Sequence, residues 1–361
     1  MDRIIVKNFG PLKDIDIELN RINLFIGENG SGKSVLGKII TIILYVINFD
    51  DKNLFFRKLV EFNINFIKDN TLIKLYKKQE IVFKLNKNTI EIDYIFLKIN
   101  SLYFNILKSA EDYSNKINKD EDLINTIEKG KEILNKSYPR YIPAERNLIS
   151  IFNQSIYTFL TADIPIPKFL ISFFSEFEKA RNSIKELDFL NIKYIYTDKI
   201  EIYYSDNEYL ELEKSSSGIQ SALPLYLTVK YFANKHQNII IEEPEQNLFP
   251  KAQKETVEYI IEQLGEENSL FMMTHSPYIL TALNNLILAN DVKNQKGIEA
   301  IKGIVKEKQC VAFEDVSAYS LIDGKAIDIM DREDRIIGVN VIDSISDEVN
   351  NIFDELLAKL D

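Results

Sequence analysis

The sequence predicts an α/β fold with a mostly parallel core sheet, an antiparallel β subdomain and an inserted helical lobe. Three observations support this prediction. Residues 22–47 have the pattern of a strand, a glycine-rich loop and a helix in direct succession. Two later apolar runs, 238–242 and 269–274, are continuous rather than alternating, which is typical of strands buried on both faces of a parallel sheet. Short alternating runs elsewhere predict antiparallel strands.

Composition limits the class of protein. The chain has 361 residues, of which 45% are hydrophobic, so it can bury a substantial core as one large domain or one domain with an insertion. The single cysteine, Cys310, excludes an internal disulfide, and with only His236 and His275 beside it Cys/His zinc sites are excluded. No targeting signal or membrane-spanning run is visible. We therefore expect a soluble, cytoplasmic protein with no membrane partner.

The net charge of −11 argues against a surface coated with phosphate-binding lysines. It does not exclude nucleic acid, because binding depends on local patches rather than on the total charge. Lysines are scattered among Asn and Ile through residues 52–136. They indicate either a solvated surface or a nucleic-acid groove, and the solvated surface is favoured.

Taken in order, the chain begins with an alternating stretch at 4–19 around a Gly10-Pro11 turn, which predicts a hairpin. Residues 27–34 then match G-x-x-x-x-G-K-[ST], the spacing of a phosphate-binding loop. Glycines let backbone N–H groups curl around phosphate oxygens at the start of a helix. Lys33 would reach the β- and γ-phosphates, and Ser34 would offer its hydroxyl to Mg²⁺. A glycine-rich turn without a ligand is the alternative. The predicted nucleotide contacts are Gly27, Glu28, Asn29, Gly30, Ser31, Gly32, Lys33, Ser34 and Val35.

The middle of the chain alternates between strand and helix patterns. Pro143 marks a loop in which Glu145 and Arg146 could face a phosphate or the water shell of a metal, or could simply order the loop. Ser217 and Gly218 open an apolar run, where a hydroxyl and bare N–H groups suit an anion, although a serine N-cap explains them almost as well. The predicted elements are strands at 71–76, 80–85 and 89–94, helices at 101–118 and 121–136, a short strand before Pro143, helices at 148–161 and 168–190, and strands at 193–197, 200–205 and 209–212.

The strand that begins at Asn238 ends in two carboxylates. In open α/β folds ligands bind beyond the carboxyl ends of the strands. Glu242 could hold Mg²⁺ through water, and Glu243 could orient and deprotonate an attacking water. The alternative is that two glutamates simply end a strand at the solvent boundary. A helix at 250–264 and a second buried strand follow, and His275 at the end of that strand could donate to a γ-phosphate or act as a local cap.

The tail predicts short strands near 300–305 and 316–322, a turn at Asp323-Gly324, a strand at 325–330 and a helix at 346–360. The charge cluster at 331–335 suggests either a metal-dependent nuclease or a solvated loop. The loop is favoured, because no second carboxylate cluster is spaced to complete a two-metal site.

The sequence resembles the ABC-type ATPase heads of the SMC, RecF and OLD group. From Met1 to about Leu288 it carries, in the order of those heads, Ile-Val-Lys-Asn-Phe-Gly-Pro, Gly-Glu-Asn-Gly-Ser-Gly-Lys-Ser, Ser-Ser-Gly-Ile-Gln, Ile-Ile-Ile-Glu-Glu-Pro-Glu and Thr-His-Ser-Pro. The resemblance implies an ABC-ATPase-type P-loop fold and an enzyme that hydrolyses ATP with Mg²⁺. It implies catalytic roles for Lys33, Glu243 and His275, and Mg²⁺ ligation by Ser34 and Glu242.

The resemblance also implies a homodimer or a higher oligomer. In such heads the signature serine and glycine, here Ser217 and Gly218, contact the γ-phosphate bound by the other subunit, so that two heads enclose two ATP molecules. Residues 246–248 resemble the loop that crosses this interface. The sequence departs from the pattern at Ile219, where a second glycine is usual, and at Glu242, where aspartate is usual. The glutamine that senses magnesium in such heads has no identifiable counterpart in this sequence, and the loop at Pro143 could take its role.

We accordingly expect one ABC-type ATPase domain over 1–361. Its parts are an ATP-binding β lobe (1–100), an inserted helical and meander lobe that ends in the signature motif (101–235), the core with the carboxylate strand and the switch histidine (236–292), and a C-terminal β/α extension (293–361). The tail lacks the Glu and Asp-x-Asp set of a Toprim nuclease. The chain is therefore most similar to stand-alone bacterial AAA-family ATPases, such as the Septu-type and retron-associated ones, that act with a separate effector in anti-phage defence.

Three functional hypotheses follow. The first is an ATP-sandwich dimer that controls a separately encoded effector, such as a nuclease. The second is an SMC- or RecF-like head that grips DNA or RNA during repair or chromosome maintenance. The third is a non-hydrolysing nucleotide sensor and scaffold. The acidic balance and the absence of long coiled-coil arms weigh against the second hypothesis, and Glu243 weighs against the third.

Overall fold

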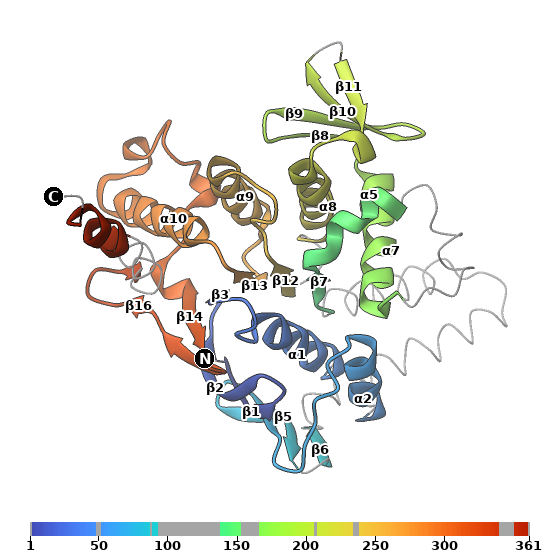
Figure 1. The fold of residues 1–361 in the computed structure, drawn as a ribbon, viewed down its shortest axis with the longest axis vertical. Coiled ribbons are helices and arrows are strands. Elements are labelled where there is room, and N and C mark those ends of the chain that lie inside the picture. The colour runs from blue at the N-terminus through green and yellow to red at the C-terminus, as the bar shows by residue number, and fades with distance from the viewer. Residues whose placement is uncertain are drawn as a thin grey trace, which may run out of the picture.

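The fold is α/β, and a continuous sheet organises it. The structure is a computed structural model that describes residues 2–47, 52–86, 89–92, 138–152, 166–205, 208–233, 238–338 and 350–359. Within these residues the main sheet has 11 strands in the order β6-β5-β4-β1-β2-β15-β14-β3-β13-β12-β7. Figure 1 shows this sheet at the centre of the molecule, with helices on either side of its upper part.

The core of the sheet is parallel. Five strands pair in parallel in the order β7-β12-β13-β3-β14. Apart from Ile322 at the end of β14, their hydrophobic side chains are buried because helices cover both faces, which explains the continuous apolar runs in the sequence. The strands are β3 (Ile22–Ile26), β7 (Arg140–Ile142), β12 (Asn238–Glu242), β13 (Ser269–Thr274) and β14 (Val316–Ile322).

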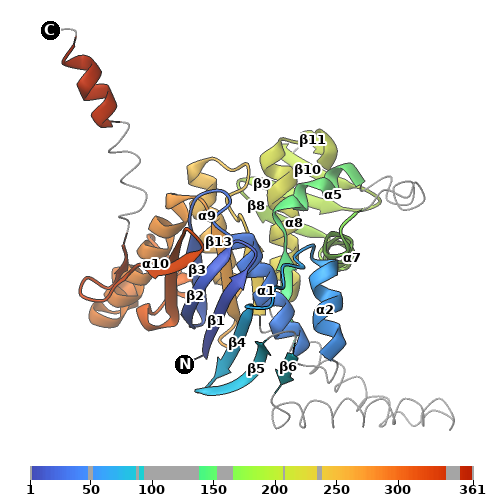
Figure 2. The same ribbon diagram turned by 60° about the horizontal axis from the view of Figure 1, so that its bottom comes forward.

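An antiparallel part extends the same sheet on one side. It confirms the predicted N-terminal hairpin and the first predicted meander. Figure 2 shows these strands extending beyond the region that the helices cover. They are β1 (Asp2–Phe9), β2 (Leu12–Leu19), β4 (Leu72–Lys77), β5 (Glu80–Asn86) and β6 (Thr89–Ile92), with β15 (Lys325–Asp328) joining β2 to β14.

Four helices sandwich the parallel core among the described residues. Helix α1 (Lys33–Val46) packs against β12 and β13 on one face, where Gly37 allows the side chain of Met273 to approach. On the other side lie α8 (Ser217–Phe232), α9 (Pro250–Gln263) and α10 (Pro277–Lys296), as Figure 1 shows. A further helix, α2 (Lys52–Glu61), packs beside α1 and was not predicted.

The described part of the inserted segment combines helices with a second sheet. After β7 come η1 (Ala144–Asn147), α5 (Leu148–Phe152) and α7 (Lys168–Ser183), followed by the strands β8 (Glu186–Phe189), β9 (Ile192–Tyr196), β10 (Ile200–Ser205) and β11 (Glu208–Glu211) and by η2 (Leu212–Lys214). The second predicted meander is confirmed. The predicted helix 168–190 is wrong beyond Ser183, because Leu187 and Phe189 alternate with acidic residues and pair with β9 across a positive-φ turn.

The tail contributes to the central sheet. The structure confirms the predicted strand at 316–322 as β14 and the turn at Asp323-Gly324. The strand predicted near 300–305 is wrong, because Gly303, with φ at 76°, lies in a series of turns. The other tail elements are η3 (Ile298–Ala300), η4 (Glu307–Gln309), η5 (Phe313–Asp315), β16 (Met330–Asp331) and β17 (Ile336–Ile337), and residues 350–357 are helical.

Some predictions lie outside the described residues, namely the helices at 101–118 and 121–136 and the parts of the helices at 148–161 and 346–360 that the ranges above omit. In the charge cluster at 331–335, Arg335 pairs with Asp291 and Glu314, and Arg332 pairs with Asp328. The described residues contain no group of three or more His, Cys, Asp or Glu side chains suited to a metal ion. Among the described helices, none combines the length and the apolar character needed to cross a membrane.

Candidate functional site

Three loops meet at one edge of the parallel sheet. In the strand register, Ile26 of β3 is paired with Thr274 of β13, and Met273 is paired with Glu242 of β12. The carboxyl ends of these strands therefore lie side by side. The residues that follow them are Gly27, Glu243 and His275, so three segments far apart in the sequence begin at the same place.

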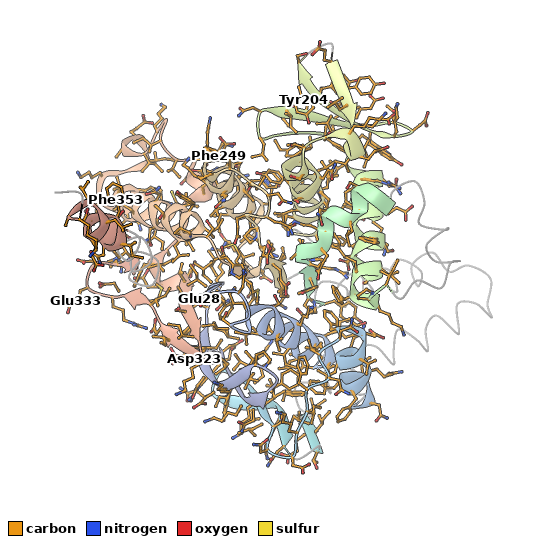
Figure 3. All side chains as sticks on the ribbon, viewed as in Figure 1. Glu28, Tyr204, Phe249, Asp323, Glu333 and Phe353 are labelled. Carbon is orange, nitrogen blue, oxygen red and sulfur yellow. The ribbon has the colours of Figure 1, made fainter. Side chains whose placement is uncertain are left out.

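The phosphate loop lies between β3 and α1. Gly32 is the N-cap of α1 and has φ at 103°, a conformation that side chains rarely adopt, so glycine is required there. The Lys33 side chain is only 4% exposed, and its Nζ donates to the carbonyl oxygens of Gly27 at 2.7 Å and Glu28 at 3.0 Å. Figure 3 labels Glu28 at this loop, near the middle of the molecule. The loop therefore folds back over its own lysine.

Lys33 is connected to Glu243 through His275. The Lys33 Nζ lies 3.1 Å from Nδ1 of His275, and Nε2 of the same ring lies 3.5 Å from Oε1 of Glu243. Nδ1 also lies 3.0 Å from the carbonyl oxygen of Gly27, so this ring nitrogen faces the lysine and the phosphate loop while Nε2 faces the carboxylate. The three side chains proposed from the sequence for catalysis are thus brought together.

Glu243 has an unusual backbone. Its φ of 46° lies in the left-handed region, which is strained for a residue that is not glycine. Its N–H donates to the carbonyl of Met273 at 2.8 Å, and its own carbonyl accepts from Gln246 at 3.0 Å. This tight turn at the end of β12 keeps the Glu243 side chain about one-third exposed and directed toward His275.

Glu242 points to the opposite side of the strand end and is 3% exposed. The hydroxyl of Tyr141 donates to its Oε1 at 2.6 Å, and Ser34 hydrogen-bonds to the same carboxyl group. Burial is the largest of the effects that raise the pKa of Glu242, so a cation at this position would stabilise its charged form. A serine hydroxyl beside a buried carboxylate fits Mg²⁺, which takes few protein ligands and keeps several waters.

Arg146 lies fully buried behind the two glutamates. Its guanidinium donates to the carbonyl oxygens of Glu242 at 2.7 Å and Glu243 at 2.6 Å, and also to those of Pro143 and Ser221. Burial lowers the pKa of Arg146 to about 10, so the group stays charged at neutral pH. Of the two interpretations of this residue, the structure supports the one in which it orders the loop. Glu145, by contrast, is exposed.

Two further residues, Tyr141 and Glu245, support the site. Tyr141 was not predicted from the sequence, because its hydroxyl reaches Glu242 only through the pairing of β7 with β12. Glu245 was not predicted either, and its Oε1 accepts from the hydroxyl of Thr274 at 2.8 Å and from the N–H of His275 at 2.7 Å. A third carboxylate two residues after Glu243 was the available signal for this cap on the histidine loop.

Ser217 and Gly218 lie apart from these contacts, at the start of α8. Ser217 is exposed, and a side chain on Gly218 would approach the carbonyl oxygen of Asn247 to 2.8 Å. Asn247 also donates to the hydroxyl of Ser221 at 3.0 Å. The signature segment therefore contacts the loop after Glu243 rather than the phosphate loop of its own chain.

The chain matches a known protein family. The model of the AAA ATPase domain family matches residues 97–280, just over half of the chain, including the carboxylate strand and His275. The chain belongs to the AAA ATPase domain family. The phosphate loop of this AAA ATPase domain protein precedes the matched residues in the sequence. The pairing of β3 with β13 places it next to His275, which lies within them. No curated protein matches the chain.

Solved structures similar to this AAA ATPase domain protein include the SMC head domain from Thermotoga maritima, 11% identical, with 91% of this chain and 97% of that chain covered and a TM-score of 0.40. Another is the Smc head domain from Pyrococcus furiosus with an extended coiled coil, bound to the C-terminal domain of ScpA. It is 11% identical, with 97% of this chain and 100% of that chain covered and a TM-score of 0.36. A third is the ADP conformation of an ATP-binding cassette of an ABC transporter. It is 14% identical, with 91% of this chain and 90% of that chain covered and a TM-score of 0.36. At these identities the likeness concerns the fold alone.

The buried Lys33 leads to a prediction about pH. Burial lowers the pKa of this ammonium to about 8 in the nucleotide-free chain, and a bound triphosphate would raise it again. Below pH 8 the lysine is charged in both states, whereas above it ATP binding must take up a proton. The affinity for ATP is therefore expected to fall by up to about tenfold per pH unit between pH 8 and 10.

Calorimetric titration with ATP at pH 9, in two buffers of different ionisation enthalpy, measures this proton uptake directly. The variant Lys33→Arg keeps the charge but does not titrate in this range, so it serves as the control. Equal proton uptake by the variant and the wild type would contradict the assignment to Lys33.

Proposed function

We propose that this protein is a Mg²⁺-dependent ATPase that closes as a dimer around two ATP molecules and controls a separately encoded effector. The observation that carries the proposal is the set of contacts that joins Lys33, His275 and Glu243 at the carboxyl edge of the sheet. A phosphate-binding lysine, a ring N–H donor and a carboxylate base are the groups that hydrolysis of a γ-phosphate requires.

Each group has a role in the proposed reaction. Lys33 would leave the carbonyls of Gly27 and Glu28 and bind the β- and γ-phosphates, which replace those acceptors. Glu243 would orient a water molecule and accept its proton, while His275 would donate to the γ-phosphate. Ser34 and Glu242 would hold Mg²⁺, which neutralises charge on the phosphates when it is bound.

The dimer is supported by the position of the signature segment. Ser217 is exposed at the N-terminal end of a 16-residue helix, where N–H groups and the helix dipole favour an anion. Its neighbours contact Asn247 rather than the phosphate loop of the same chain. A second copy could therefore present its γ-phosphate to this segment.

Control of an effector, as part of anti-phage defence, is the finer part of the proposal. It is supported by the resemblance to stand-alone bacterial ATPases of defence systems and by a tail whose described strands β14 and β15 join the main sheet. The acidic net charge favours a protein partner over a nucleic-acid partner.

Phosphate release from ATP tests the proposal. The wild type is expected to release phosphate with Mg²⁺ present and to stop when the metal is chelated, and light scattering is expected to show a dimer that ATP stabilises. Binding of ATP without phosphate release, with or without DNA, would favour the nucleotide sensor. Retention on DNA that is lost steeply between low and moderate salt would favour the DNA-gripping head.

A further inference from the structure

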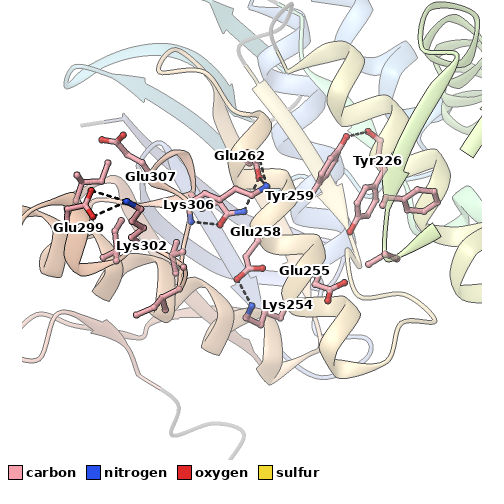
Figure 4. Close-up of a pocket in the computed structure, with 18 residues that line it drawn as sticks. Tyr226, Lys254, Glu255, Glu258, Tyr259, Glu262, Glu299, Lys302, Lys306 and Glu307 are labelled. Atoms are coloured by element: carbon pink, nitrogen blue, oxygen red, sulfur yellow. Dashed lines mark hydrogen bonds and ion pairs between the residues drawn. The ribbon is translucent and has the colours of Figure 1, made fainter. Parts of the chain in front are cut away.

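A cavity of about 680 Å³ lies on the other side of α9 from the parallel sheet. Its lining comes from parts of the chain far apart in the sequence, namely Phe189, Leu190 and Tyr226 together with residues of α9 between 254 and 262 and of the turns between 298 and 309. Figure 4 shows the aromatic residues Tyr226 and Tyr259 on one side and the loop with Lys302 and Lys306 on the other. We call this cavity the α9 pocket.

The floor of the α9 pocket is aromatic, with the half-buried Tyr259 over the buried Tyr226 and Phe189, and its rim is apolar. Tyr226 and Tyr259 stack with their ring centroids 4.1 Å apart, and Phe189 packs against Tyr226. At the rim, Ile298 is 47% exposed and Ile304 is 77% exposed. Large aliphatic side chains so exposed beside an aromatic floor are typical of a surface that another chain covers.

The charges of the pocket are not balanced. Five glutamates and three lysines line it. Each lysine pairs with one glutamate, in the pairs Lys254–Glu258, Lys306–Glu262 and Lys302–Glu299. The two other glutamates, Glu255 and Glu307, reach only lysines outside the lining, at 3.9 Å. The pocket therefore carries a surplus of negative charge on a protein whose net charge is already −11.

We propose that the α9 pocket is the docking site for a basic segment of a partner protein, with apolar side chains placed on the aromatic floor and Lys or Arg side chains facing Glu255 and Glu307. Such a segment complements both the charge and the apolar surface. The volume suits several side chains rather than one. The inference rests on the proposed function in one respect, which is that the partner would be the effector.

The exposed helix at 350–357 is a poorer occupant. It also presents apolar side chains, with Phe353 at 63% and Leu356 at 59% exposure, and Figure 2 shows it standing apart from the rest of the chain. However, Asp354 and Glu355 lie among those side chains. Like charges would face each other if this helix entered the α9 pocket of its own chain or of a second copy.

The pocket is connected to the nucleotide site through its two helices. Helix α8 carries Ser217 at its first turn and Tyr226 further along, and α9 follows the loop that begins at Glu243. The hydroxyl of Tyr259 donates to the carbonyl of Tyr226 at 3.1 Å, which links the two helices at the pocket floor. A partner seated there contacts both helices that lead to the nucleotide, as a controlled effector requires.

Selection from a random dodecapeptide phage library against the immobilised full-length protein tests the proposal. The enriched peptides are expected to combine Lys or Arg with Leu, Ile or aromatic residues. Synthetic copies, measured by fluorescence polarisation, are expected to bind about tenfold more weakly to Ile304→Asp and to the double variant Glu255→Lys/Glu307→Lys. The matched control Glu266→Lys/Glu267→Lys makes the same change in net charge at an exposed turn outside the pocket, and it is expected to change binding by less than about twofold.

Three outcomes would overturn the proposal: no enrichment of basic peptides, binding that neither pocket variant weakens, or equal loss of binding in the control. A labelled peptide of residues 350–361 that binds the wild type and loses affinity for Ile304→Asp would also overturn it, by assigning the pocket to the chain's own helix. Phosphate release is measured separately on every variant. Peptide binding by a protein that releases no phosphate would refute the proposed ATPase and leave the docking site standing.

Discussion

Glu243→Gln is expected to lower the rate of ATP hydrolysis by about 10²–10⁴-fold, the usual contribution of a general base. Glutamine keeps the size of the side chain and its contact with His275, but it cannot accept the proton of the attacking water. ATP binding is expected to persist, because Lys33 and the phosphate loop are unchanged. The variant should therefore accumulate as an ATP-bound dimer.

Phosphate release, equilibrium binding of a fluorescent ATP analogue and light scattering measure these three properties. The matched control is Glu145→Gln, which neutralises an exposed carboxylate in the neighbouring turn at 144–147. Its rate of hydrolysis is expected to stay within a few-fold of that of the wild type. Unchanged hydrolysis in Glu243→Gln would remove this residue from the mechanism, whereas loss of ATP binding would indicate a structural role.

Arg146→Met is expected to destabilise the protein by about 3–5 kcal/mol and to lower Tm by roughly 4–7 °C. The substitution removes a buried guanidinium and the hydrogen bonds that it donates to four carbonyl oxygens, those of Pro143, Ser221, Glu242 and Glu243, of which that of Glu243 keeps its bond from the Gln246 N–H. Unsatisfied buried carbonyls are costly because no water reaches them. Thermal unfolding followed by circular dichroism measures the change.

The variant Arg146→Lys distinguishes the effect of Arg146 on stability from its effect on the geometry of the site. Lysine keeps the charge but offers one ammonium instead of a planar fork, so it cannot reach all four carbonyls together. Its stability is expected to lie between those of Arg146→Met and the wild type, with a lower hydrolysis rate at saturating ATP. Arg332→Met, which removes an exposed ion pair with Asp328, should cost less than about 1 kcal/mol. A loss in Arg332→Met as large as that in Arg146→Met would refute the assigned role.

The parts of the site that could be predicted from the sequence are those that a short, contiguous sequence pattern specifies. The phosphate loop is a contiguous motif, and Glu242, Glu243 and His275 follow apolar runs whose ends are visible in the sequence. The contacts of Tyr141, Glu245 and Arg146 depend on which strands become neighbours, which local pattern does not specify. The same limit explains the fold. The N-terminal hairpin and the strands of both meanders were predicted correctly because these strands are adjacent in sequence, whereas β8 and the insertion of β14 between β3 and β15 were not.

The position of β14 has a consequence for biosynthesis. The strand that leads into the phosphate loop gains its neighbour on one side only when residues 316–322 are available, almost three hundred positions later, and the carbonyl of Leu321 then comes close to Gly27. Contacts of such long sequence separation form late and slowly. A nascent chain emerging from the ribosome therefore exposes an unpaired, apolar edge of β3 until most of the polypeptide has been made. During that interval it is vulnerable to aggregation and is a natural client for chaperones.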